Sequence, residues 1–437
     1  MKKVFVAFSV IFLLLSTEVI GTAKSINTEN NEDKNIAIEK PADVSEFFSH
    51  QKNYVPGEHV NKAIKTIYLA FHIWQDEDGT GNLSRSDFVY ENLYDIVDRL
   101  NSRFRRAHTP VRPVEGVDYI RDSHIRFELK GIHYYQNAEN HTVGCGAGQR
   151  LNQYVFRDNP QNREYLNIHF VKGSCRGASG YANYPSSRNL EADSYVVTYV
   201  KPYWKEEERY PFYATMVHLA HEIGHNMGLR HPYDSEYCNF SHPDYLFDLF
   251  GSEKQDWCDN PRGNCDVCYH EGGWVCDLED PKTTCTNNIM GGNRNAGSIT
   301  PLQMGRMNRS LSRKSVRKYA WGYSDSAFVV DKNELWDFNQ KFYQDIRVKS
   351  GVTLYLTGEL EMVPQAGIIL EPGSLLVVDG GLITNALYSH SFWQGIKKEP
   401  KPSRGLAFWK SRPDKGKVIL KNDGNIENTL MEPSGSQ

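Results

Sequence analysis

The sequence predicts an α/β (α+β) domain that contains a mixed sheet, followed by a small all-β C-terminal domain. Three observations support this fold class. A strand, a polar loop and an amphipathic helix follow one another after residue 60, a helix of strict apolar period covers residues 211–228, and short apolar runs between Gly and Pro-Gly turns begin past residue 340. We therefore place the first domain at residues 61–320 and the second at residues 340–437.

The strands of the first domain are predicted from alternating apolar patterns. Residues 67–72 form the first strand, and a Gly-rich loop separates it from a helix that ends at about Arg106 and carries its apolar residues on one face. Further strands are expected at residues 124–129, 165–171, 180–184 and 194–200. This order predicts a sheet with long helices packed on it.

Two further helices complete the first domain. The helix over residues 211–228 begins at a proline that suits the first turn. Its apolar face consists of Phe212, Met216, Leu219, Ile223 and Met227. The later helix begins at Thr300 and Pro301, an N-cap followed by a first-turn proline, and extends to about Lys318.

The C-terminal domain is predicted from three short β-runs, over residues 352–356, 367–370 and 375–378. Their apolar residues recur at short intervals, which resembles the edge of a β-solenoid. Three turns are few for a repeat, so a small sandwich packed against the first domain is the plainer interpretation.

The N-terminus carries the pattern of a secretion signal. Two lysines precede an apolar run that ends at Leu15, and a small-residue site precedes Lys24, so residues 1–23 are predicted to be a signal peptide. No later segment offers about 18 unbroken apolar residues, so no membrane span is expected in the mature chain. Residues 24–60 are polar and are predicted to be a linker or a pro-segment. An uncleaved N-terminal anchor is the alternative.

The composition limits the partners. The 437 residues include 50 basic and 54 acidic side chains, with a formal net charge of -4, so there is no general attraction to nucleic acid or anionic lipid. The 39% of hydrophobic residues are enough for a buried core. We expect an exported protein that is extracellular, periplasmic or held at the cell surface, and the oligomeric state is not predicted.

The eight cysteines agree with export, because they form an even set that lies wholly in the mature chain. Six of them lie between residues 238 and 285, which favours a loop-rich insert held by disulfides. Their pairing stays open. A structural zinc site formed by Cys258, Cys265, Cys268 and Cys276 is the alternative, since Cys265 and Cys268 have a C-x2-C spacing.

Residues 221–231 carry the chemistry. They read His-Glu-Ile-Gly-His-Asn-Met-Gly-Leu-Arg-His, the pattern H-E-x-x-H-x-x-G-x-x-H. On a helix, His221 and His225 project from the same side and can bind one ion. Gly228 can adopt the left-handed conformation that ends the helix, so that His231 returns to the same ion. Three imidazoles and one open position predict a catalytic zinc site.

Glu222 is predicted to be the general base. It lies beside the first ligand but is rotated around the helix, so its carboxylate can take a proton from the attacking water without binding the metal. His218 lies one turn before His221, but three histidines already complete the site. We therefore expect His218 to be a neighbouring or surface residue.

The loop over residues 76–84 superficially resembles a calcium-binding EF-hand loop. It lacks the preceding helix and the bidentate Glu at loop position 12, where Asp87 stands instead. We interpret it as a solvated turn and not as a metal site.

The motif together with the segment Thr286-Asn-Asn-Ile-Met290 resembles a metzincin metallopeptidase with its Met-turn. The resemblance implies that Met290 lies beneath the metal site. Ordinary core packing is the alternative for this methionine.

Within that clan the chain looks most similar to the secreted pappalysin family, over about residues 61–320. The resemblance rests on residues 165–169 and 180–185, on the motif helix, on Cys238 after the third histidine, on residues 244–248, and on Asn288 with Met290. It implies that residues 180–184 form the edge of the cleft and pair with an extended substrate.

Two features depart from the resemblance or extend it. Family members often carry a tyrosine two residues beyond the Met-turn methionine, where it assists the oxyanion. This chain has Gly291 and Gly292 after Met290, so no tyrosine at that position can assist the oxyanion. The resemblance also implies a possible calcium site at Asp244 and Asp248, with solvated or capping carboxylates as the alternative.

Taken together, the sequence predicts a secreted zinc-dependent endopeptidase that hydrolyses peptide bonds of extracellular proteins, with zinc as cofactor and calcium as a possible second one. An adhesin or glycan-binding surface protein that uses the β domain is the alternative. An enzyme that acts on a non-peptide amide, such as a deacetylase, is a third possibility.

Overall fold

The computed structural model describes residues 51–58, 60–110, 113–200, 209–231, 246–250, 269–270, 273–274, 287–291, 296–400 and 415–430. The predicted signal peptide and most of the predicted linker or pro-segment lie outside these residues. The described residues belong to one compact unit, residues 41–437. Among them, no helix combines the length and the apolar character that a membrane crossing needs.

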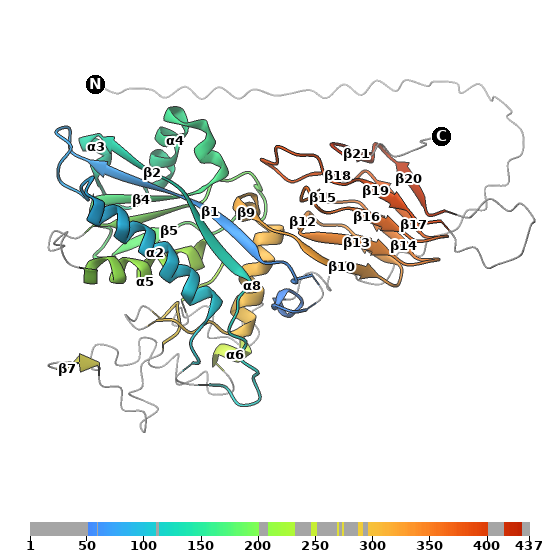
Figure 1. The fold of residues 1–437 in the computed structure, drawn as a ribbon, viewed down its shortest axis with the longest axis horizontal. Helices are drawn as coiled ribbons and strands as arrows, with labels where there is room; N and C mark the ends of the chain where they lie inside the picture. The colour runs from blue at the N-terminus through green and yellow to red at the C-terminus, as the bar shows by residue number, and fades with distance from the viewer. Residues whose placement is uncertain are drawn as a thin grey trace, which may run out of the picture. The chain divides into compact units, whose positions relative to one another are not determined.

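The first domain contains a mixed sheet in which the path β2-β1-β4-β6-β5 is joined by β3 on β4 and by β9 on β1 (Figure 1). The strands are β1 (Lys65–Gln75), β2 (Ile125–Gln136), β3 (Thr142–Val143), β4 (Leu166–Gly173), β5 (Gly180–Ala182), β6 (Tyr195–Tyr199) and β9 (Ala320–Trp321), with a separate hairpin of β7 (Tyr269–His270) and β8 (Gly273–Trp274). The pairs of β1 with β2 and β4, and of β4 with β6, are parallel, whereas β5 pairs antiparallel with β6.

The helices of this domain cover both faces of the sheet. They are η1 (Gln51–Tyr54), α2 (Asp87–Arg105), α3 (Ala138–His141), α4 (Gly148–Asp158), η2 (Pro160–Glu164), α5 (Arg209–Asn226), α6 (Phe247–Phe250), α8 (Pro301–Arg313) and η4 (Ser315–Tyr319). Helices α2 and α5 bury their apolar faces in one cluster with Ile67 and Phe71 of β1, while Leu151 of α4 packs in a second cluster with Trp74. Since neighbouring side chains of a strand point to opposite faces, the two clusters lie on the two sides of the sheet.

Most of the predicted elements of the first domain are confirmed, but one helix was not predicted and one helix ends earlier than expected. The helix α4 was not predicted, because its short apolar face is interrupted by polar residues and Ala147 provides no side-chain cap. The last predicted helix ends at Arg313, ahead of the expected Lys318. The backbone is extended at Lys314, and the N–H of Ser315 donates to the carbonyl of Ser186, which turns the chain into the separate helix η4.

A disulfide joins Cys145 and Cys175. The strands β3 and β4 are parallel neighbours, and the disulfide links the chain just after β3 to the chain just after β4. This bond agrees with the expected oxidised cysteines. The other six cysteines, and with them the predicted disulfide-held insert and its zinc alternative, lie outside the described residues.

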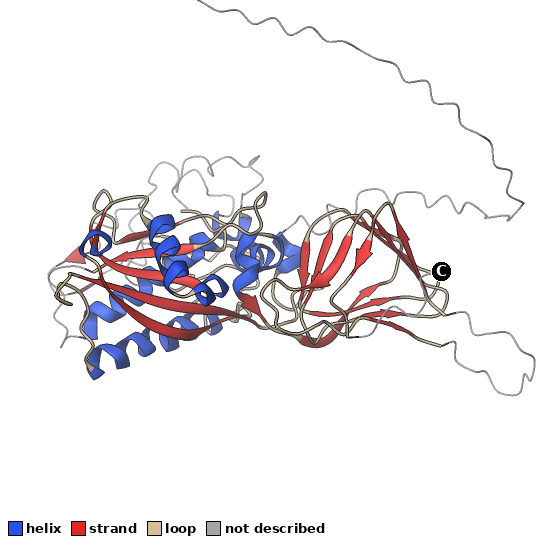
Figure 2. Ribbon diagram, turned by 90° about the horizontal axis from the view of Figure 1, so that it is seen from above, coloured by secondary structure: helices blue, strands red, loops and turns tan. Residues whose placement is uncertain are grey.

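The C-terminal domain is a parallel β-solenoid that begins at Ser324, ahead of the expected residue 340 (Figure 2). Each of its rungs supplies one strand to each of three parallel sheets. The rungs are β10 (Ser324–Val330), β11 (Glu334–Trp336) and β12 (Gln340–Phe342); β13 (Gln344–Val348), β14 (Thr353–Leu356) and β15 (Glu359–Met362); β16 (Ile368–Leu370), β17 (Leu375–Asp379) and β18 (Leu382–Asn385); and β19 (Ile396–Lys398), β20 (Lys417–Lys421) and β21 (Asn425–Ile426).

The interpretation as a small sandwich is therefore wrong, and the solenoid alternative is confirmed. Parallel pairing in register places like residues above one another, as for Phe328, Ile346, Ile368 and Ile396. The first three of these side chains are almost fully buried. An apolar interior formed by stacked rungs explains why the apolar residues recur at short intervals.

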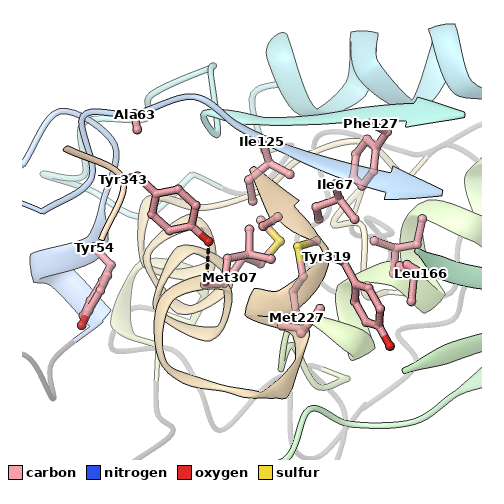
Figure 3. Packing of buried hydrophobic residues seen from close by; sticks show 14 of the residues in the cluster. Tyr54, Ala63, Ile67, Ile125, Phe127, Leu166, Met227, Met307, Tyr319 and Tyr343 are labelled. Carbon is pink, nitrogen blue, oxygen red and sulfur yellow. Dashed lines mark hydrogen bonds between the residues drawn. The ribbon is translucent and has the colours of Figure 1, made fainter. Parts of the chain in front are cut away.

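The solenoid docks on the first domain through buried polar contacts. Nε of Arg317 in η4 donates to Oε1 of Glu361 in β15 at 3.0 Å, and both side chains are buried. Nζ of Lys341 donates to the carbonyls of Arg317 and Ala320, and burial lowers the pKa of this lysine to about 7. Figure 3 shows Tyr54 and Tyr343 within the apolar cluster that extends across this junction. The two domains therefore share one core.

The Arg317–Glu361 pair gives a first prediction. We expect Glu361→Ala to lower the free energy of unfolding by about 3–5 kcal/mol, because it leaves a buried guanidinium with only the partly exposed Glu359, 4.0 Å away, as a counter-charge. Glu128→Ala is the control, because it breaks the exposed ion pair of Glu128 with Lys130. It should lower the free energy of unfolding by at most about 1 kcal/mol. Urea unfolding measures both, and equal losses would contradict the prediction.

Three histidines form a ladder across the sheet. His133 of β2, His72 of β1 and His169 of β4 lie at the same register, and their stacked rings have centroids 5.2 Å and 5.1 Å apart. His72 shares a hydrogen bond with Asn167, and His169 shares one with Asn152. Burial lowers the pKa of His72 to about 3 and that of His169 well below its ordinary value.

The ladder predicts acid sensitivity. In the unfolded chain a histidine binds a proton below about pH 6.5, whereas the buried neutral ring of His72 does not, so stability is lost as the pH falls below that value. His72→Gln should remove about 1.4 kcal/mol per pH unit from the slope of unfolding free energy between about pH 6 and pH 4.

His390→Gln is the control for this experiment, because the side chain of His390 is 80% exposed. Asp158 faces His133, whose pKa burial also lowers, and both residues stay unchanged in the two variants. Urea unfolding at several pH values gives the slopes. An unchanged slope for His72→Gln would show that this ring does not cause the loss of stability at low pH.

Candidate metal centre

Helix α5 ends in a turn that returns the chain toward the helix. Four of the residues predicted from the apolar period, Phe212, Met216, Leu219 and Ile223, are buried on the helix, and Met227 is buried just after it. After the helix, the N–H of Gly228 donates to the carbonyl of His225, and the N–H of Leu229 donates to the carbonyl of Gly224. Gly228 has φ +86°, so this is a Schellman cap with glycine in the left-handed position.

The turn brings three imidazoles together. The Nε2 atom of His231 lies 3.1 Å from the Nε2 atoms of both His221 and His225. The Nδ1 atoms of the two helical histidines face backbone carbonyls, that of Ile289 at 3.0 Å and that of Leu229 at 2.9 Å. Carbonyl oxygens only accept hydrogen bonds, so both Nδ1 atoms carry the proton and both Nε2 lone pairs point to the shared centre.

This donor set fits a zinc ion. Lone pairs that face one another at this distance repel, and a cation between them removes the repulsion. Tetrahedral zinc with bonds of about 2.0–2.1 Å to imidazole holds its ligand atoms ~3.3 Å apart, close to the spacings found here. Among the described residues this is the one group of three or more His, Cys, Asp or Glu side chains with that geometry. Burial, followed by the neighbouring imidazoles, keeps the pKa of His221 well below its ordinary value, which favours the neutral ring that binds metal.

Met290 lies directly under the helix, at Gly224. A Cβ atom at Gly224 would lie 2.7 Å from Sδ of Met290, so a larger residue at the second variable position of the motif would have to displace this side chain. Met290 is fully buried, and Oδ1 of Asn288 accepts the hydrogen bond from its N–H. The carbonyl of Ile289 in the same turn orients His221. The turn thus contacts the motif helix at Gly224 and His221, and a place of Met290 beneath a metal site stays a prediction.

Glu222 follows His221 on the helix, and its side chain is 7% exposed. Burial raises the pKa of this carboxyl to about 8 in the metal-free protein. Oε1 of Glu222 lies 3.5 Å from Nε2 of His218, one turn away on the same helix. His218 is therefore a neighbour of the predicted base and not a member of the three-histidine cluster.

The two predicted calcium residues differ in outcome. Asp244 lies outside the described residues. Asp248 is buried, and its two oxygens accept hydrogen bonds from the hydroxyl of Thr300 and the N–H of Leu302 at the start of α8. This geometry agrees with the capping alternative, and a calcium site here stays a prediction. Burial raises the pKa of Asp248 to about 6.

The loop over residues 76–84 is a turn, as expected. Thr80 donates twice to the carboxylate of Asp78, and Asn82 donates to the carbonyls of Trp74 and Phe170. These bonds hold the loop over the ends of β1 and β4.

Sequence reasoning missed the residues that fix the edge of the site. Nδ2 of Asn226, the residue after the second ligand, donates to the carbonyl of Asn183 at 2.8 Å and to the carbonyl of Tyr195. Tyr184, which follows Asn183, packs its ring against His225 with centroids 5.3 Å apart. The sequence predicted Tyr184 only as the end of a strand and of a segment that carries the resemblance, with no role of its own. A polar residue inside a buried helical stretch was the signal that could have drawn attention to Asn226.

The comparisons with known proteins agree with this site. The family model described as Reprolysin_5, Metallo-peptidase family M12, matches residues 72–263, which is less than half of the chain but includes the whole three-histidine motif. The match agrees with the resemblance to a metzincin metallopeptidase that the sequence indicated for this region. No curated protein matches the chain.

Two solved structures are similar to the chain. One is mature mirolysin from Tannerella forsythia in complex with a cleaved peptide, at 18% identity and a TM-score of 0.32, over 56% of this chain and 90% of that one. The other is mirolysin in complex with a compound, at 18% identity and a TM-score of 0.33, over 56% and 91%. A likeness at this level does not extend to activity or substrate.

The contact between Gly224 and Met290 gives a prediction. We expect Gly224→Ala to lower the free energy of unfolding by about 1–3 kcal/mol and to weaken zinc binding, because the added methyl group must displace the buried Met290. Thermal unfolding and competition with a zinc indicator measure the two effects.

A double variant provides the control. Gly224→Ala combined with Met290→Ala should cost less than the sum of the two single changes, because the second change opens space for the methyl group. Additive losses would show that the added Cβ acts elsewhere in the helix.

Proposed function

We propose that the protein is a secreted zinc endopeptidase that hydrolyses peptide bonds of extracellular proteins, with Glu222 as general base. The observation that carries this proposal is the convergence of three Nε2 atoms at the end of a helix that also carries the buried carboxylate of Glu222, the residue directly after His221. A purely structural metal site has no use for such a carboxylate.

The roles of the residues follow from their placement. His221, His225 and His231 would hold zinc, which supplies a Lewis acid for the carbonyl under attack. Glu222 would take the proton from the attacking water and deliver it to the leaving amine. Burial makes this carboxylate a stronger base than an exposed glutamate, and a cation held by the histidines would lower its pKa again.

The substrate is proposed to extend the sheet. Strand β5 pairs with β6 and lies at the end of the described sheet order, so its second edge is not paired with another described strand. A peptide in extended conformation could bind there through main-chain hydrogen bonds, which supports recognition of an unfolded segment or loop. β5 precedes Asn183 and Tyr184, and it therefore ends next to His225.

Secretion and subfamily are part of the proposal. The N-terminal apolar run and the Cys145–Cys175 disulfide support export to an oxidising compartment. The motif segments support a pappalysin-like enzyme, and calcium dependence is proposed with it.

The proposal predicts that Glu222→Gln keeps zinc and loses turnover by a factor of about 10²–10⁴, because the amide cannot accept the proton. Zinc content is measured on the purified protein, and turnover is measured on casein, gelatin and a proteome-derived peptide pool with and without chelator. Glu128→Gln, at a surface site, is the control and should leave activity unchanged.

Zinc-loaded wild-type protein that is inert on every peptide pool would contradict the proposal. That outcome would favour the alternative of an adhesin or glycan-binding protein, with the β-solenoid as the binding part. Release of acetate from acetylated amines without peptide cleavage would instead indicate a deacetylase.

A further inference from the structure

We propose that Tyr184 is a specificity residue, whose ring contacts a large apolar side chain of the substrate next to the scissile bond. This inference rests on the proposed peptidase function. Tyr184 is 43% exposed, although its ring packs edge-to-face on the metal ligand His225. Among the exposed large apolar side chains of the described residues, it is the one in ring contact with the histidine cluster.

The backbone on both sides of Tyr184 is held in place. The carbonyl of Asn183 accepts from Asn226, and the side-chain oxygen of Asn183 accepts from the N–H of Tyr195. Beyond the ring, the N–H of Ser186 donates to the hydroxyl of Ser315, whose own N–H donates to the carbonyl of Ser186. Because hydrogen bonds precede and follow it, the backbone at Tyr184 cannot shift without breaking contacts to α5 and η4.

The ring itself is also oriented. The guanidinium of Arg230 lies over its face, 4.8 Å from the centroid, and His225 contacts its edge with an interplanar angle of 68°. Both contacts come from the motif segment that holds the metal ligands. An aromatic ring that is exposed and already oriented loses little entropy when it binds, which favours it as a contact for substrate.

Its position relative to β5 defines what it can touch. Tyr184 is two residues beyond Ala182, the end of β5, which corresponds to about 7 Å along an extended chain. A peptide that pairs with β5 and reaches the histidine cluster must therefore pass the ring with a residue next to the scissile bond. An aromatic or long aliphatic side chain at that position gains contact with the phenol ring, whereas alanine does not.

The test compares the wild-type protein with Tyr184→Ala on a set of matched peptides. Peptide cleavage by the zinc-loaded full chain is first profiled to find the bond that is cut. Phe or Ala is then placed at each of the two positions that flank this bond. Tyr184→Ala should reduce kcat/KM by about two- to tenfold for Phe at one of the two positions, and should leave the Ala peptides nearly unchanged.

Tyr184→Phe is the conservative variant and should keep the preference for Phe, since the ring is retained. Zinc affinity, measured by competition with a chelator, is compared for all three proteins. An equal fall of kcat/KM on the Phe and Ala peptides, together with weaker zinc binding, would overturn the inference and show that Tyr184 only supports His225.

Failure of the underlying function gives a different result. If the zinc-loaded wild-type protein cuts no peptide, the proposed peptidase activity is wrong. If it cuts peptides with no dependence on the flanking residue in either enzyme, only the role of Tyr184 is wrong.

Discussion

The site depends on the way in which helix α5 ends. His221 and His225 share one face of a rigid helix, but the third imidazole meets them only because Gly228 has a positive φ and reverses the chain. A side chain is disfavoured there for two reasons, since φ is left-handed and a Cβ would already lie 3.0 Å from the hydroxyl of Ser310. The helix end therefore defines the spacing of the three Nε2 atoms.

A second set of contacts keeps the ligands in the correct orientation. Backbone carbonyls of Ile289 and Leu229 determine which ring nitrogen of each helical histidine carries its proton. One of these carbonyls belongs to the turn that contains Met290, and the side chain of Asn288 in this turn exchanges hydrogen bonds with Gln303 of α8. The three histidines are thus connected to α8 through the turn that contains Met290.

Helix α8 also connects the centre to the β-solenoid. The hydroxyl of Tyr343 in the solenoid donates to the carbonyl of Leu311 at the end of α8, and Arg317 and Lys341 complete the junction a few residues later. One helix thus contacts both the turn next to the three histidines and the solenoid. A role of the solenoid in contact with the first domain does not conflict with a role of its surface in binding.

Much of the fold and of the centre could be predicted because the signals are local. Helix α5 repeats its apolar residues over several turns, and the spacing of its histidines is a property of the helix itself. What the sequence by itself determined is this local geometry, with three histidines, a glutamate and a glycine at fixed intervals. The tertiary structure decided which residues from distant segments meet them, such as Met290 and Tyr184, and that the C-terminal strands stack as a solenoid. Such contacts depend on how separate elements pack, and the spacing of residues along the chain carries no direct record of that packing.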